Sequence, residues 1–132
     1  MNWTEYTDEC RERGFYNGSD RETNREQLEL ALVGLVTEAA EALDTLKKIK
    51  FHHHPTDKAH LIKLLLELGD HNWYYALALQ VIPKVFASQH PLCESSCTPE
   101  LLHNYILECN LEKLSARYSE GYSDDASLNR KV

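Results

Sequence analysis

The chain has 132 residues, of which 14 are Lys or Arg and 21 are Asp or Glu, and its formal net charge is −7 at pH 7. This length suits one domain, residues 1–132. The acidic balance and the lack of a basic stripe disfavour nucleic acid as a partner. No apolar run reaches the roughly 20 residues that span a bilayer, and the N-terminus MNWTEYTDEC is too polar for a secretory leader. We therefore expect a cytoplasmic protein that does not bind membranes.

Helical patterns cover most of the chain. A short helix is predicted for residues 2–13, and a loop for 14–22, which are rich in Gly, Asn, Ser and Asp. A long helix is then predicted from Thr23 or Asn24 to Lys50. Its core stripe, at spacings of three and four, is predicted to be Leu28, Leu32, Leu35, Ala39, Ala42 and Leu46.

A second long helix is predicted from Thr56 to Ile82, after a turn that contains Pro55. It is apolar almost all round, so we expect it to form the buried centre of the fold. Pro83 is expected to break or kink it.

The third long helix is predicted to start at Thr98, with Thr as N-cap and Pro in the first turn, and to end near Tyr118. Its predicted apolar face is Leu101, Leu102, Tyr105, Ile106, Cys109 and Leu114. The polar tail, residues 119–132, is expected to be extended. The fold class is therefore all-α: a bundle of three long helices and a short N-terminal helix. The apolar second helix needs more cover than one subunit gives, so we expect a dimer or tetramer to complete the bundle.

Two acidic pairs interrupt the apolar helices. Glu38 and Glu41 lie in LALVGLVTEAAEAL, and Glu67 and Asp70 lie in HLIKLLLELGDHNWYYALAL. A spacing of three places both carboxylates of a pair on one helix face, and antiparallel packing would bring the two pairs together. Carboxylates in apolar surroundings are costly without a cation, and an all-oxygen ligand set suits Mg²⁺ or Mn²⁺. Acidic pairs elsewhere in the chain are expected on solvated faces.

Two other metal sites are weaker alternatives. A di-iron bundle needs Glu-x-x-His on two helices, and Glu100 with His103 gives that spacing once. A zinc site could use Cys93 and Cys97 with His90 and His103, but no CxxC occurs, and reduced thiols are the simpler interpretation. The triplet His52-His53-His54 is interpreted as a solvated turn.

Residues 25–118 resemble the MazG-like nucleoside triphosphate pyrophosphohydrolases. The resemblance rests on a helix with ExxE, a turn, and a helix with ELGD followed by an aromatic pair, and the tail is similar to that of phage-type and cassette-type members. It implies an all-α homodimer or homotetramer that hydrolyses (d)NTPs to (d)NMPs and pyrophosphate. It also implies a catalytic and Mg²⁺-binding set of Glu38, Glu41, Glu67 and Asp70. Many relatives have a further glutamate where this chain has Thr37, so the number of metal ions stays open.

The resemblance also implies substrate contacts by Tyr74, Asn110 and Lys113. Lys63 lies one turn before Glu67 and is a candidate either for a phosphate contact or for a structural salt bridge. A non-catalytic helical nucleotide-binding or assembly protein of the same fold is the alternative function, favoured by Thr37. The base and sugar preference, the general base, and a housecleaning, regulatory or phage role remain open.

Overall fold

A computed structural model describes residues 1–14, 21–94 and 96–129 of the chain, and these residues form helices and no strand. The prediction of an all-α fold is confirmed. The elements are α1 (Trp3–Glu12), α2 (Arg21–Phe51), α3 (Lys58–Val85), the 3₁₀ turn η1 (Pro91–Cys93), α4 (Pro99–Arg117) and α5 (Asp124–Leu128). No described helix combines the length and the apolar character needed to cross a bilayer.

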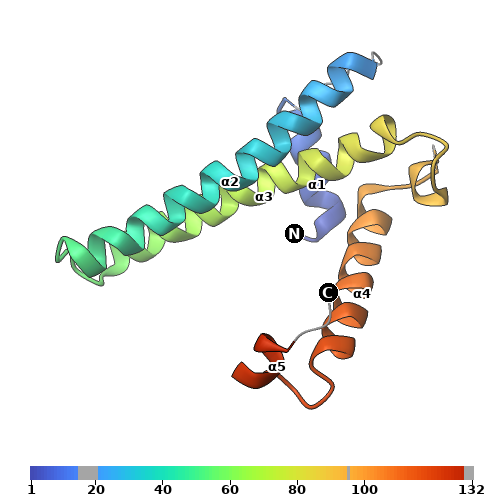
Figure 1. The fold of residues 1–132 in the computed structure, drawn as a ribbon. Helices are drawn as coiled ribbons and strands as arrows, with labels where there is room; N and C mark the ends of the chain where they lie inside the picture. The colour runs from blue at the N-terminus through green and yellow to red at the C-terminus, as the bar shows by residue number, and fades with distance from the viewer. Residues whose placement is uncertain (15–20, 95, 130–132) are drawn as a thin grey trace.

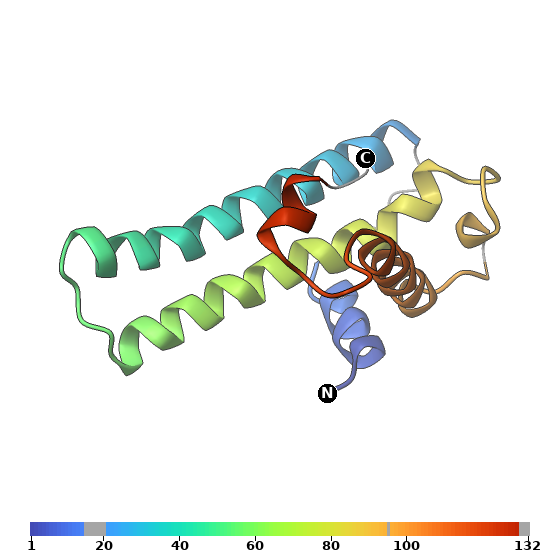
Figure 2. The same ribbon diagram turned by 60° about the horizontal axis from the view of Figure 1, so that its bottom comes forward.

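A long antiparallel hairpin of α2 and α3 is the frame of the molecule (Figures 1 and 2). The two helices lie side by side and are joined at the far end by residues 52–57. Helix α1 packs against α3, and α4 starts beyond the end of α3 and runs away from the hairpin. The acidic pairs of α2 and α3 are therefore carried on neighbouring helices that run in opposite directions.

The helix starts follow from capping residues in the sequence. Asn2 caps α1 in a reciprocal arrangement with Glu5, because its side chain accepts from the Glu5 N–H at 2.9 Å and its own N–H donates to the Glu5 carboxylate. Asp57, Thr98 and Ser123 cap α3, α4 and α5 in the simpler way, each accepting from a backbone N–H three residues later.

The core lies where α1 and α4 join the hairpin. Its buried apolar side chains belong to α1, α2, α3 and α4, and are Cys10, Ala31, Ala76, Leu77, Ala78, Leu79, Val81 and Leu102. At its edge the indole of Trp3 stacks on the His103 ring with centroids 4.7 Å apart, and the Tyr75 hydroxyl lies 3.1 Å from His103 Nδ1. One aromatic cluster thus ties α1, α3 and the first turns of α4 together.

Several predicted boundaries were wrong. Helix α2 begins at Arg21, and most of the predicted loop at 14–22 lies outside the described residues. Helix α3 continues through Pro83 to Val85, and the Phe86 N–H donates to the Ile82 carbonyl to close its last turn. The predicted extended tail contains α5, because Ser123 caps a short helical turn there.

The predicted core stripe of α2 was wrong in part: Leu28, Leu35 and Ala42 are half-buried, but its other three positions are exposed. Leu32 and Leu46 are about half exposed, whereas Ala31 and Thr45 are almost fully buried against α3. Small side chains allow two helices to approach closely. The stripe of small residues that includes Ala31 and Thr45, which lies beside the leucines, therefore forms the contact with α3. Leu32 and Leu46 are therefore left on the surface of the single chain.

Helix α3 is not the buried centre along its whole length. Its second half is buried from Ala76 to Leu79 and at Val81, but its first half exposes Leu61, Ile62, Leu65, Leu66 and Leu68. The predicted apolar face of α4 is covered only near its start, at Leu102 and partly at Ile106. A two-helix hairpin buries one face of each helix, so the other apolar faces remain uncovered.

Candidate metal centre

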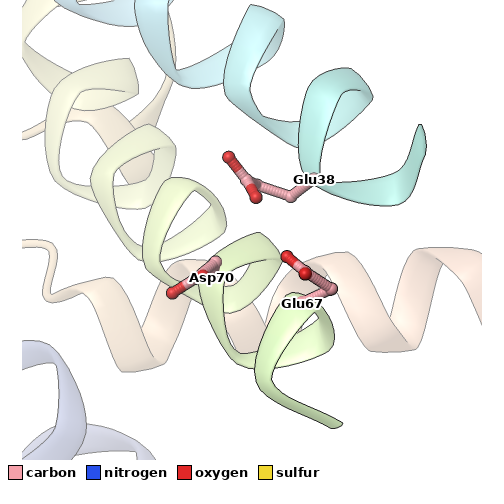
Figure 3. Close-up of side chains that lie close together, drawn as sticks. All are labelled: Glu38, Glu67 and Asp70. Carbon is pink, nitrogen blue, oxygen red and sulfur yellow. The ribbon is translucent and has the colours of Figure 1, made fainter. Parts of the chain in front are cut away.

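Three of the four predicted carboxylates meet between α2 and α3. Glu38 reaches from α2 toward Glu67 and Asp70 of α3, and one oxygen of each lies within 4.8 Å of the others (Figure 3). Glu38 and Glu67 are half-buried and Asp70 is exposed. We call these three residues the acidic triad. Its members come from two consecutive helices of the chain, which the turn of the hairpin brings side by side.

The register of the hairpin brings the triad together. Gly34 precedes Glu38 by one turn of α2, and Tyr74 follows Asp70 by one turn of α3. The Tyr74 ring occupies the space next to Gly34 where any other residue would place its Cβ atom. Because the helices are antiparallel, this close contact sets Glu38 opposite Asp70 and Glu67. Gly34 is therefore a supporting residue of the site, and its place one turn before Glu38 on the small-residue stripe is the sequence signal for it.

Helix α1 approaches the same region. Burial raises the pKa of the Tyr6 phenol well above its usual value, and the neighbouring Cys10 side chain and the charge of Asp70 raise it further. Burial also raises the pKa of the Cys10 thiol. Tyr6 thus stays protonated beside a carboxylate of the triad, a role that the sequence pattern did not indicate.

The triad concentrates negative charge in a small volume. Within residues 1–14, 21–94 and 96–129, none of its members forms an ion pair with a basic side chain. Three carboxylates this close repel one another unless a cation or protons compensate. Their hard oxygen donors fit Mg²⁺ or Mn²⁺, which are bound by one or two carboxylates, water and substrate phosphates.

Glu41 lies outside the triad. Its side chain is exposed beside a surface hollow of about 470 Å³ that Ala40, Leu43, Asp44 and Lys47 also line. The Lys48 ammonium has its pKa raised chiefly by Asp44 and to a smaller extent by Glu41. The structure therefore separates Glu41 from Glu38, although both lie on the same helix one turn apart.

The four residues predicted to contact the substrate do not all lie beside the triad. Tyr74 is half-buried and packs on Gly34, so its ring supports the hairpin beside the triad. Lys63 is exposed one turn before Glu67 and forms no ion pair with a described residue. The structural salt bridge that was one of its two predicted roles is therefore not formed within the described part of the chain. Asn110 and Lys113 are exposed side chains in the second half of α4, beyond the turns that pack on α1 and α3.

The alternative metal sites do not assemble in the described part of the chain, where the triad is the one group of three or more close ligand side chains. Glu100 accepts a hydrogen bond from the Thr4 hydroxyl, and His103 stacks on Trp3. The four cysteines are unpaired thiols, with Cys10 buried and Cys109 exposed.

Comparisons with protein-family models, curated proteins and solved structures find no match to this chain.

Proposed function

We propose that the protein is a Mg²⁺-dependent nucleoside triphosphate pyrophosphohydrolase that converts (d)NTPs to (d)NMPs and pyrophosphate. The observation that carries the proposal is the convergence of Glu38, Glu67 and Asp70 across the hairpin. These are three of the four carboxylates that the family resemblance assigns to the metal. Mn²⁺ would serve in place of Mg²⁺ because it prefers the same oxygen ligands.

The donor set suits a reaction on a polyphosphate. Glu38, Glu67 and Asp70 would hold the metal, and a bound divalent ion would neutralise phosphate charge and activate a water molecule for attack. The exposed side of the triad, at Asp70, leaves room for substrate oxygens as further ligands. Lys63 carries a positive charge on the same α3 face one turn away, where it would attract a phosphate. Catalysis of phosphoryl transfer rests mainly on such positioning and charge compensation.

We also propose that the protein works as a homodimer or homotetramer. Large apolar side chains are more than half exposed on both helices of the hairpin, among them Val36, Leu43, Leu65 and Leu66. A monomer rarely leaves so many apolar groups on one continuous element. A second copy of the same hairpin offers a matching surface, and closed symmetric dimers are the commonest solution.

The test is pyrophosphate release from a panel of canonical and damaged NTPs and dNTPs with Mg²⁺, with Mn²⁺ and with EDTA. We expect metal-dependent release that falls by about 100-fold or more in Glu38→Gln and Asp70→Asn, the loss typical of removing charge stabilisation from a transition state. Glu29→Gln is the matched control, because Glu29 is an exposed glutamate of α2 outside the triad.

Two outcomes would contradict the proposal. Folded protein with metal that releases no pyrophosphate from any nucleotide would favour a non-catalytic assembly or nucleotide-binding protein. Release that is unaffected by both triad substitutions would place the activity elsewhere.

A further inference from the structure

The tip of the hairpin carries histidines that the proposed reaction does not use. His52, His53 and His54 follow the end of α2, and His60 lies in the first turn of α3. The tip is the end of the hairpin away from α1 and α4 (Figures 1 and 2). The structure separates the consecutive histidines and pairs only one of them with His60.

His54 and His60 present two ring nitrogens to each other. His54 Nδ1 lies 3.3 Å from His60 Nε2, and the rings are nearly perpendicular, with an interplanar angle of 78°. Two nitrogen ligands of a tetrahedral zinc ion, each about 2.0–2.1 Å from the metal, lie about 3.3–3.4 Å apart. The spacing of this pair is therefore the spacing that one bound ion requires.

Asp57 selects the form of His60 that binds metals. The Asp57 carboxylate lies 2.8 Å from His60 Nδ1 and accepts its proton in a hydrogen bond. In a neutral ring with Nδ1 protonated, Nε2 carries the free lone pair. A carboxylate behind the second ring nitrogen is the usual support of a metal-binding histidine.

The backbone holds both histidines in place. The Lys48 carbonyl accepts from the N–H groups of His52 and His54, at 3.1 and 3.2 Å, and His53 adopts the left-handed conformation with φ of 56°. This is a helix C-cap in which His54 leaves α2 in a defined direction. On the other side, Asp57 caps α3 by accepting from the His60 N–H at 3.0 Å. Two helix termini thus hold the backbones of His54 and His60 in place before any ion binds.

We propose that His54 Nδ1 and His60 Nε2 form a binding site for a divalent transition metal such as Zn²⁺, with Asp57 as the residue that orients His60. Water would take the remaining positions of the ion. Imidazole nitrogens favour zinc, copper and nickel, whereas the carboxylates of the triad favour Mg²⁺ and Mn²⁺. The chain would then hold two chemically different metal sites, one along the hairpin and one at its tip.

The test is titration with Zn²⁺ alone in a buffer that contains excess Mg²⁺, followed by calorimetry and by NMR of the imidazole nitrogens. We expect one equivalent of Zn²⁺ to shift His54 Nδ1 and His60 Nε2. His54→Gln and His60→Gln should each weaken binding by tenfold or more. Asp57→Asn should weaken it by about 10-fold, the lower end of the range for such supporting carboxylates.

His52→Gln is the matched control, because His52 belongs to the same triplet but has no ring nitrogen paired with His60. It should leave Zn²⁺ affinity unchanged, and circular dichroism should show the same helix content in every variant. Three results would overturn the proposal: Zn²⁺ signals confined to the cysteines, a Zn²⁺ affinity in His54→Gln and His60→Gln equal to that of the parent protein, or a loss of affinity in His52→Gln as large as in those two variants.

Discussion

The ring of Tyr74 lies directly against the backbone of Gly34, in the position that a side chain at residue 34 would occupy. This contact brings α2 and α3 close together one turn from the acidic triad. It makes a glycine in the middle of a long helix necessary, although glycine costs a helix roughly 0.5–1 kcal/mol relative to alanine. The separation of Glu38 from Glu67 and Asp70 is therefore coupled to a residue that carries no charge.

Gly34→Ala should destabilise the protein by about 1–3 kcal/mol, the usual cost of forcing an extra group into a packed contact. Chemical denaturation in metal-free buffer measures this change. Gly69→Ala is the control, since no atom lies within 4 Å of a Cβ built on Gly69. That variant should be stabilised by about 0.5–1 kcal/mol. Equal responses in the two variants would show that the Tyr74 contact does not limit the approach of the helices.

Mg²⁺ should stabilise the fold through the triad. A ligand that binds only the folded state adds about 2.7 kcal/mol to the free energy of unfolding at 100 times its Kd. We expect thermal unfolding to shift upward with Mg²⁺ concentration and to return to the metal-free value with EDTA. In Glu67→Gln the shift should be largely lost, whereas stability without metal should not fall, because one repulsive charge is gone.

Glu41→Gln tests, in the same experiment, whether three carboxylates bind the metal or all four that the family resemblance implies. Because Glu41 lies outside the triad, its substitution should reduce the Mg²⁺ shift less than Glu67→Gln does. An equal reduction would show that Glu41 joins the ligands when metal binds.

The free energy of unfolding should fall at alkaline pH because Tyr6 and Cys10 lose their protons. Their pKa values are raised in the fold, chiefly by burial, so the unfolded chain releases these protons at lower pH than the folded chain. The stabilisation is complete below the unfolded pKa values, about 8.5 for Cys and about 10 for Tyr, and is lost as pH rises beyond them.

Tyr6→Phe should therefore reduce the slope of stability against pH between about pH 9 and 11, as measured by urea unfolding. Tyr122→Phe is the control, since the Tyr122 side chain is exposed on the surface. A slope that is the same in the Tyr6 and Tyr122 variants would show that Tyr6 ionises normally in the fold.

The exposed apolar side chains of α2 and α3 should control assembly. Val36→Gln and Leu66→Gln should shift the protein toward smaller species in sedimentation experiments, because both side chains are more than 60% exposed on the single chain and are expected to be buried between copies. Leu128→Gln is the control, an exposed leucine of α5 away from the hairpin. A monomeric parent protein would contradict the proposed assembly.

The sequence by itself determined the helices and their approximate ends. Helix periodicity and capping residues such as Asn2, Asp57 and Thr98 act within a few residues, so they can be read without a fold. The acidic pairs and the turn at Pro55 also indicated which side chains could meet across the hairpin. Pro83 does not end α3, which continues to Val85, because a proline this close to the helix end removes only one backbone hydrogen bond.

Only the tertiary structure decided which face of each helix packs. Helix α2 has a leucine stripe and a small-residue stripe side by side, and periodicity alone favours the larger one. The close approach of Gly34 to Tyr74 selects the small stripe, so Leu32 stays exposed and Glu38 faces Glu67. The same rotation leaves Glu41 outside the triad. At the tip, the pairing of His54 with His60 depends on two helix caps meeting in space, a relation that no single stretch of sequence contains.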